Sequence, residues 1–307
     1  MTQKVLCIGA TLIDELYFCE GTITPYSSNP AQKSSHIGGV MSNIVQHLAL
    51  LGVEVSLLTA LGNDGEAARV RQSLEAIGID LKASLQVDGP TGKYVSVLDA
   101  DGSLHVAVCQ DSCTAALTVT ALEAQVGFLK TFPYWLADTN LPTETLQWLI
   151  QTAKREGKKL VIEPVSVPKA AKLATLDLNG VYMITPNEDE LVAITAVASE
   201  TEGLNQVFSR GVQNLWLRKG EQGSVMHNAT SHQAQGVPKL TIVDSTGAGD
   251  AALAGWLYAH LQGKDSLDCL KYGHTLAFNI LLQKGTVDAN MNPERLNQLI
   301  QTYYHDY

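Results

Sequence analysis

Short apolar runs alternate with longer segments of helical periodicity over most of the chain. Val5–Ile8 is a brief apolar run closed by Gly9, which predicts a buried strand. After Gly38-Gly39, apolar residues recur every three or four positions up to Gly52, which predicts a helix that ends there. By the same criteria we expect further strands at residues 53–58, 134–137, 160–162, 183–184, 215–217 and 224–226. Further helices are expected at residues 67–77, 144–154, 251–261 and 266–282.

One segment departs from this alternation of strands and helices. Between residues 93 and 109, apolar and polar positions alternate on both sides of Asp101-Gly102, a dipeptide typical of a tight hairpin turn. Such a hairpin predicts a small sheet that stands apart from the main one. We therefore expect a single three-layer α/β domain over residues 1–307, with a mainly parallel central sheet. A small β lid is expected from about residues 15–36 and 93–109.

Composition and charge narrow the classes of function. Of the 307 residues, 45% are apolar and 17% are charged, so the chain can bury a packed core. The 21 Lys and Arg residues against 31 Asp and Glu give a net charge of −10, which argues against a nucleic-acid polymer as partner. No signal peptide, membrane-length apolar stretch or CxxC pair is present. We expect a soluble, cytoplasmic protein with no membrane partner.

The most informative segment is glycine-rich and lies late in the chain. An apolar run at residues 240–243, expected to be a strand, leads through Gly247-Ala248-Gly249 into an apolar helix. Small residues there let backbone amides point into one concave space, which together with the helix dipole can hold charge on a transferring phosphoryl group. Asp250 then lies in the first helical turn and can accept a proton from an attacking hydroxyl. The alternative is that Asp250 only caps the helix after an ordinary turn.

Two familiar nucleotide-binding motifs are missing from the sequence. No G-x-x-x-x-G-K-[ST] occurs, because the segment 89–94 has the wrong spacing and ends in Tyr94. No G-x-G-x-x-G follows the first strand, where only Gly9 stands. Both absences argue against a P-loop NTPase and against a dinucleotide-dependent oxidoreductase.

Several motifs, taken together and in order, resemble the ribokinase (phosphofructokinase-B) family of sugar and nucleoside kinases over nearly the whole chain. The motifs are Asp14, Gly38-Gly39 with Asn43, Asn187 with Glu190, the segment 217–220 with Gly223, and Asp244 with Gly247-Ala248-Gly249-Asp250. The resemblance implies a ribokinase-like fold and an ATP-dependent kinase. It makes Asp250 the general base and the amides of residues 247–250 the groups that stabilise the transition state.

The same resemblance implies roles for the other motif residues. Substrate would be bound by Asp14, Gly38, Gly39 and Asn43, and ATP by Asn187, Gly220, Gly223 and Thr246. Asn187 and Glu190 would help to hold Mg²⁺, partly through water, and Asp244 with Thr246 would contribute to a site for a monovalent cation such as K⁺. The residues alone leave plainer alternatives: Asp14 as a turn residue, the glycine pair as a turn, and residues 188–190 as a solvated helix start.

A narrower resemblance, to the pseudouridine kinases of that family, rests on segments 28–30, 38–52, 94–99, 137–140 and 163–166. It implies transfer of the γ-phosphoryl of ATP to a nucleoside 5′-hydroxyl, with Ser28, Asn29 and Asp138 near the base. The chain departs from the pattern at Glu163, where Asp is usual, at Met41-Ser42, and at the unusually charged pair Arg218-Lys219.

Other acceptors remain open: free ribose, adenosine, inosine or uridine. The fold could also belong to a non-catalytic nucleoside sensor. An exposed lid edge favours a homodimer formed through the lid.

Overall fold

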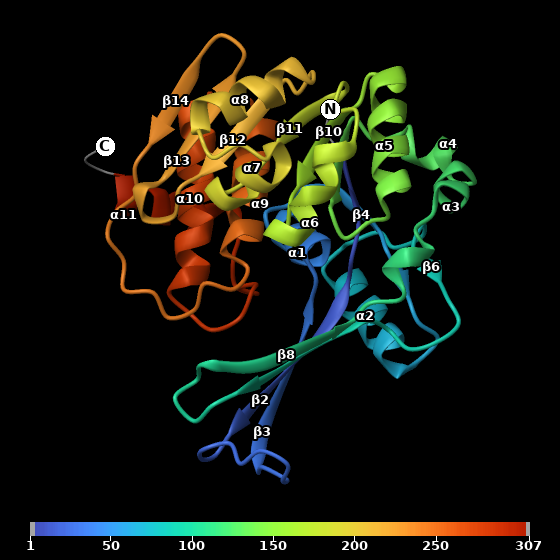
Figure 1. Cartoon of the computed structure of the whole chain (residues 1–307), viewed down its shortest axis with the longest axis vertical. Helices are drawn as coiled ribbons and strands as arrows, with labels where there is room; N and C mark the ends of the chain where they lie inside the picture. The colour runs from blue at the N-terminus through green and yellow to red at the C-terminus, as the bar shows by residue number, and fades with distance from the viewer. Residues whose placement is uncertain (1–3, 305–307) are drawn as a thin grey trace.

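The computed structural model describes residues 4–304 and has a large mixed sheet at its centre (Figure 1). The strand order is β14-β13-β12-β11-β10-β9-β1-β4, parallel from β12 to β4 and antiparallel at β13 and β14. The strands are β1 (Val5–Ile8), β4 (Val55–Leu58), β9 (Tyr134–Asp138), β10 (Lys159–Glu163), β11 (Val181–Ile184), β12 (Asn214–Arg218), β13 (Ser224–Asn228) and β14 (His232–Gln235). The mainly parallel sheet is therefore confirmed.

Helices cover both faces of this sheet, because successive residues of a buried strand point to opposite sides. Val5 and Cys7 join one hydrophobic core, and Leu6 and Ile8 join the other. The first core contains residues of α1 (Val40–Leu50), α2 (Gly65–Ala76), α9 (Ala248–Leu261), α10 (Ser266–Leu281) and α11 (Pro293–Tyr304). The second contains residues of α3 (Val119–Glu123), α4 (Val126–Leu129), α5 (Thr143–Glu156), α6 (Val167–Ala170), α7 (Glu188–Thr195) and α8 (Glu200–Ser209). The structure thus has the expected three layers.

A second, four-stranded sheet projects from the carboxyl edge of the large one (Figure 1). This small sheet has the order β3-β2-β7-β8 and consists of β2 (Leu12–Cys19), β3 (Ala31–Gly38), β7 (Lys93–Leu98) and β8 (Leu104–Gln110). It is attached at that edge because β2 begins only a few residues after β1 ends. The remaining short elements are β5 (Ala60–Leu61) paired with β6 (Leu85–Gln86), and the 3₁₀ turns η1 (Thr114–Ala116), η2 (Ala171–Thr175) and η3 (Gly220–Gln222).

The prediction of a strand at residues 240–243 is wrong. The chain leaves the sheet after β14, the edge strand, and residues 236–243 form no strand. Ile242 and Val243 are exposed, and the Val243 amide donates to the Leu281 carbonyl at the end of α10 instead of to a strand. Apolar character alone does not make a strand without a neighbour to pair with. Within residues 4–304, no helix is long and apolar enough to cross a membrane.

Candidate active site

The glycine-rich segment forms the start of helix α9, at the carboxyl edge of the large sheet. Gly247 is the N-cap residue with φ of 78°, a left-handed conformation that favours glycine. A Cβ on Gly247 would also lie 2.8 Å from Cβ of Thr286, so the turn has no room for a side chain. The amides of Gly249 and Asp250 lie in the first helical turn and have no acceptor within the helix. We call the backbone amides of residues 247–250 the amide nest.

Asp250 lies buried beside this nest and is bonded to a residue from the opposite end of the chain. The Asn43 side chain donates from Nδ2 to Oδ2 of Asp250 over 2.8 Å, although 207 residues separate the two. Burial raises the pKa of Asp250 to about 7, in spite of the Asn43 hydrogen bond and the Arg218 charge, which lower it. Within residues 4–304 the side-chain hydrogen bond of Asp250 is at Oδ2, so Oδ1 is left for another donor. A carboxyl with this pKa is half ionised near neutral pH.

Asn43 is held in place by a third residue. Its Oδ1 accepts a hydrogen bond of 3.1 Å from the hydroxyl of Thr286, in the loop after α10. Asn43 therefore connects Thr286 with Asp250, so its amide orientation is fixed by the hydrogen bonds on both sides. The sequence assigned Asn43 to a sugar hydroxyl, whereas the structure places its amide on the carboxyl group of Asp250.

The glycine pair lies where β3 meets α1, next to Asp14. Gly39 has φ of 92°, and a Cβ there would lie 2.6 Å from the Ala10 carbonyl oxygen, so both conformation and space require glycine. A Cβ on Gly38 would collide with the carboxyl group of Asp14. Burial raises the pKa of Asp14 to about 6. The pair thus lets a carboxyl from β2 pack against the backbone at the start of the helix that carries Asn43.

Asp138 lies at the end of β9, beside the end of β1, where the strand order of the sheet reverses. One of its oxygens accepts from the Ala10 amide over 3.2 Å and the other from the Asn140 amide over 2.9 Å. Burial raises the pKa of Asp138 to about 6. In this structure its carboxyl group holds the chain after β1.

An ion-pair cluster of Arg218, Glu163 and Glu190 lies next to the amide nest. Arg218, the last residue of β12, donates from Nη2 to Oε1 of Glu163 over 2.7 Å and lies 3.5 Å from Oε2 of Glu190. The other Glu163 oxygen accepts from the Thr185 hydroxyl. Burial alone would lower the pKa of Arg218, but the carboxylates of Glu163 and Glu190 raise it. Nη1 of Arg218 lies 2.5 Å from the position that a Cβ on Gly249 would take, so the guanidinium reaches the nest.

Asn187 and Glu190 form a capping box at the start of α7. The Asn187 side chain accepts from the Glu190 amide over 2.8 Å, and the Glu190 carboxyl accepts from the Asn187 amide over 2.9 Å. Among residues 4–304, no group of three or more His, Cys, Asp and Glu side chains could hold a metal ion. Asn187 and Glu190 therefore fit Mg²⁺ only as a supporting pair, with the ion bound mainly by phosphates and water.

The remaining predicted nucleotide and cation residues lie in two turns. Gly220, with φ of 54°, begins η3 directly after the pair Arg218-Lys219, and Gly223, with φ of 89°, follows η3 directly. Asp244 accepts from the Thr246 amide over 2.9 Å, which closes a turn just before the amide nest. Both turns lie next to elements of the cluster, one after β12 and the other before α9.

Ser28 and Asn29 are not brought to this cluster. They lie in the loop between β2 and β3, at the end of the small sheet away from Asp14 (Figure 1). The Asn29 side chain bonds the backbone of Thr24 and Ser27, so it closes its own loop.

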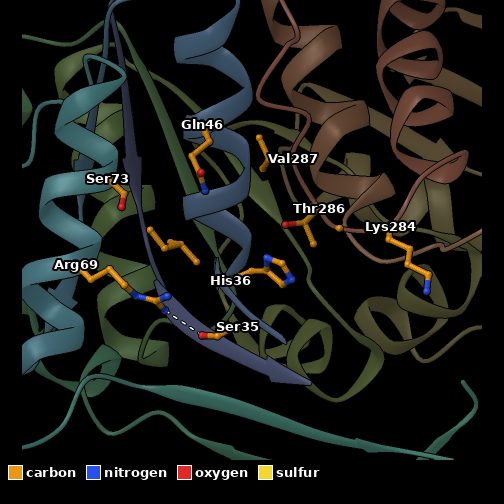
Figure 2. Close-up of a pocket in the computed structure, with 10 residues that line it drawn as sticks. Ser35, His36, Gln46, Arg69, Ser73, Lys284, Thr286 and Val287 are labelled. Atoms are coloured by element: carbon orange, nitrogen blue, oxygen red, sulfur yellow. Dashed lines mark hydrogen bonds between the residues drawn. The ribbon is translucent and has the colours of Figure 1, made fainter. Parts of the chain in front are cut away.

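A cavity of about 380 Å³ lies between β3, α1, α2 and the loop after α10 (Figure 2). It is lined by Ser35, His36, Ile37, Gln46, Arg69, Ser73, Lys284, Gly285, Thr286 and Val287. Neither Asp14 nor Asp250 lines it, so the cavity adjoins the cluster around the nest without including its carboxyl groups. Thr286 belongs to both, because it lines the cavity and donates to Asn43.

Sequence reasoning missed three residues that the structure brings to the cluster. Thr286 carries no motif signal, since its contact with Asn43 spans 243 residues. Glu163 and Arg218 stood out only as departures from a pattern. Opposite charges at the carboxyl ends of two strands with apolar centres were the signal that could have paired them.

The fold and this cluster together define a ribokinase-like small-molecule kinase. A model of the pfkB family of carbohydrate kinases matches residues 2–294, and the chain belongs to that family. It is 28% identical over 275 residues to the pseudouridine kinase of Escherichia coli K12, with 87% of each chain covered.

Two solved structures share the fold. One is Arabidopsis thaliana ribokinase complexed with ribose and ATP, with TM-score 0.84, 19% identity and coverage of 98% of this chain and 99% of that one. The other, described as a ribokinase II of Escherichia coli in complex with ATP and Mg²⁺, has TM-score 0.82 and 17% identity. The match covers 98% of this chain and 99% of that one.

Proposed function

We propose that this protein transfers the γ-phosphoryl group of ATP to the 5′-hydroxyl of a nucleoside, with pseudouridine the favoured acceptor. The observation that carries the proposal is the 2.8 Å hydrogen bond between Asn43 and Asp250, next to the amide nest. It joins the helix that follows the early glycine pair to the carboxyl group that follows the late glycine-rich turn. A general base and an anion-binding nest are thereby within reach of one substrate.

In the proposed step, the acceptor hydroxyl oxygen forms a bond to the γ-phosphorus from the side opposite the leaving oxygen. The bond between that phosphorus and the β–γ bridging oxygen breaks, and ADP leaves with its electron pair. The hydroxyl proton passes to Oδ1 of Asp250, while Asn43 holds Oδ2. The amides of Gly249 and Asp250 bind the charge that spreads over the phosphoryl oxygens.

Mg²⁺ bound to ATP would neutralise phosphate charge, with Glu190 and Asn187 supporting it mainly through water. The monovalent-cation site at Asp244 and Thr246 stays a prediction, and replacing K⁺ by a large organic cation in the assay tests it. Gly220, Gly223 and Thr246 are proposed to line the ATP site because their turns flank the cluster.

Acceptor binding is assigned to Asp14, Gly38 and Gly39, with Asp138 at the strand-order reversal near by. The small sheet is proposed to act as a lid that excludes water, so that ATP is not hydrolysed. Ser28 and Asn29 stay predicted base-reading residues although they lie at the far end of that sheet.

We also propose a homodimer that forms through the small sheet. β8 is an edge strand whose backbone groups have no further strand to pair with among the described residues. Val106 and Val108, on one face of β8, are 48% and 62% exposed. Adjacent exposed apolar residues on an open edge are typical of a protein contact surface.

The acceptor is tested by an assay of ADP formation from MgATP with pseudouridine, uridine, adenosine, inosine and ribose. We expect kcat/KM to be highest for pseudouridine, with mass spectrometry of the product placing the phosphate on the 5′-oxygen. The similarity of the fold to a ribokinase in complex with ribose makes ribose the strongest alternative. If no acceptor stimulates ADP formation although nucleosides bind, the protein is a sensor and the proposal is wrong.

A further inference from the structure

The ion-pair cluster beside the amide nest contains a positive charge that the proposed mechanism has not used. We infer that Arg218 is a catalytic residue that donates hydrogen bonds to the γ-phosphoryl group during transfer, while Glu163 is the positioning residue that holds it. This inference rests on the proposed function and adds a side-chain cation to the backbone groups of the nest.

The placement of the guanidinium supports this role. Its Nη2 is held by Glu163 over 2.7 Å, whereas its Nη1 lies against Gly249, in the first turn of α9. The positive end of a helix repels a cation, and the carboxyl groups of Glu163, Glu190 and Asp250 offset that repulsion at Arg218. Backbone amides and a guanidinium that point into the same space all donate hydrogen bonds and all carry positive charge or partial charge there. This arrangement suits a polyanion such as a phosphate.

The hydrogen bonds of Arg218 support it as well. Nε is buried and has no hydrogen-bond partner among the described residues, although a guanidinium offers donors in a planar fork. A buried donor without an acceptor is costly to the fold. Nη1, which lies at Gly249 and is not the nitrogen that Glu163 binds, is free to donate to a phosphoryl oxygen in the nest.

Glu163 is suited to position Arg218 and not to bind substrate. It is 3% exposed, and both its oxygens are engaged, one by Arg218 and the other by the Thr185 hydroxyl. The backbone of Arg218 is fixed too, because its amide donates to the Pro186 carbonyl over 2.9 Å. No bond to Arg218 is made or broken in the reaction.

The first test compares nucleotide binding and needs no acceptor. ATP and ADP are titrated calorimetrically, with Mg²⁺, into the wild type and into Arg218→Gln, with Arg155→Gln as a control that removes an exposed arginine of α5. Because the contact is to the γ-phosphoryl group, we expect Arg218→Gln to bind ATP about tenfold more weakly. ADP affinity should stay within about twofold. Equal ATP affinity in both proteins would overturn the inference, and a wild type that binds neither nucleotide would overturn the proposed function.

The second test measures turnover with the best acceptor. Arg218→Gln should lower kcat by about 10²–10³-fold with the acceptor KM unchanged, the usual cost of one transition-state donor. Arg218→Lys should recover only part of the rate, because lysine lacks the planar fork. Guanidinium at tens of millimolar should raise kcat of Arg218→Ala and leave that of Asp250→Asn unchanged.

A structural role predicts a different pattern. Arg218→Gln and Glu163→Gln would then lower the unfolding temperature while the folded fraction kept the wild-type kcat and the wild-type preference for ATP over ADP. That result would exclude Arg218 as a catalytic residue and leave Asp250 as the base. The catalytic role instead predicts that Glu163→Gln lowers kcat less than Arg218→Gln and weakens ATP binding in the same direction.

Discussion

The cluster around the start of α9 and the small sheet differ in how completely one chain builds them. In the cluster, Asp250, Asn43 and Thr286 form a chain of hydrogen bonds, and Asp250 and Asn43 are 9% and 5% exposed. On the small sheet, Val106 and Val108 stand exposed, and Asn29 bonds only its own loop. The groups assigned to phosphoryl transfer are therefore held in place by the chain itself, whereas on the small sheet, the proposed lid, apolar side chains are left exposed.

The largest effect on kcat is expected at Asp250, in the cluster around the start of α9. Asp250→Asn should lower kcat by about 10²–10⁴-fold, because the amide cannot accept the hydroxyl proton. Acceptor affinity should stay within about threefold, since the assigned acceptor contacts lie elsewhere. Single-turnover kinetics together with nucleoside titration measure both quantities. A rate near that of the wild type would remove Asp250 as the base and with it the functional contrast between the two regions.

A smaller effect is expected from the residue that holds Asp250. The Asn43 hydrogen bond lowers the pKa of Asp250, so Asn43→Ala should raise that pKa above about 7. The wild type should lose kcat/KM as the pH falls through about 7, where the carboxyl becomes protonated.

In Asn43→Ala this loss should begin at higher pH, with a rate at neutral pH lowered by about tenfold. Rate profiles between pH 5 and 9 check the shift, since ionisation of the base determines the acid limb. A profile that does not move would show that the 2.8 Å contact has no role in catalysis.

A substitution on the small sheet should change the acceptor KM and the oligomeric state, and not kcat. Val108→Glu introduces charge on the exposed face of β8, so it should shift the protein toward a monomer and raise the acceptor KM by about threefold to tenfold. ATP affinity should not change, because the nest belongs to α9. Sedimentation velocity and steady-state kinetics test this, with Lys82→Glu on an exposed loop as the control. A fall in kcat with an unchanged acceptor KM would mean that the small sheet does not serve the acceptor.

The smallest effect concerns stability. Burial raises the pKa of Asp250 from its ordinary 3.8 to about 7, so the folded protein binds the proton more tightly than the unfolded chain does. The free energy of unfolding therefore falls as the pH rises from about 4 to about 7.

Asp250→Asn should consequently melt a few degrees higher than the wild type at pH 8. The difference should vanish toward pH 4, and thermal unfolding at both pH values measures it. A melting temperature at pH 8 that is equal to or below that of the wild type would contradict the buried, strained state of this carboxyl.

The sequence predicted those features of the fold and the site that depend on residues close together in the chain. Periodicity located α1, and the long apolar run located α9, because α1 buries one face whereas α9 is buried on all sides over residues 250–259. Short apolar runs located most strands of the parallel sheet. The strand predicted at residues 240–243 is absent, because an apolar run does not reveal whether a neighbouring strand exists. The glycines and Asp250 were recognised as candidates, but the contact partners Thr286 and Glu163 lie far from Asn43 and Arg218 in the sequence, in the loop after α10 and on β10. Such partners follow only from the tertiary arrangement.

The most direct measurement is a crystal structure of the protein with pseudouridine and a non-hydrolysable MgATP analogue. We expect the 5′-hydroxyl oxygen at about 2.6–3.2 Å from Oδ1 of Asp250, in line with a γ-phosphoryl group held by the amide of Gly249. A nucleoside bound with its 5′-hydroxyl directed away from Asp250, or a γ-phosphoryl group outside the amide nest, would contradict it.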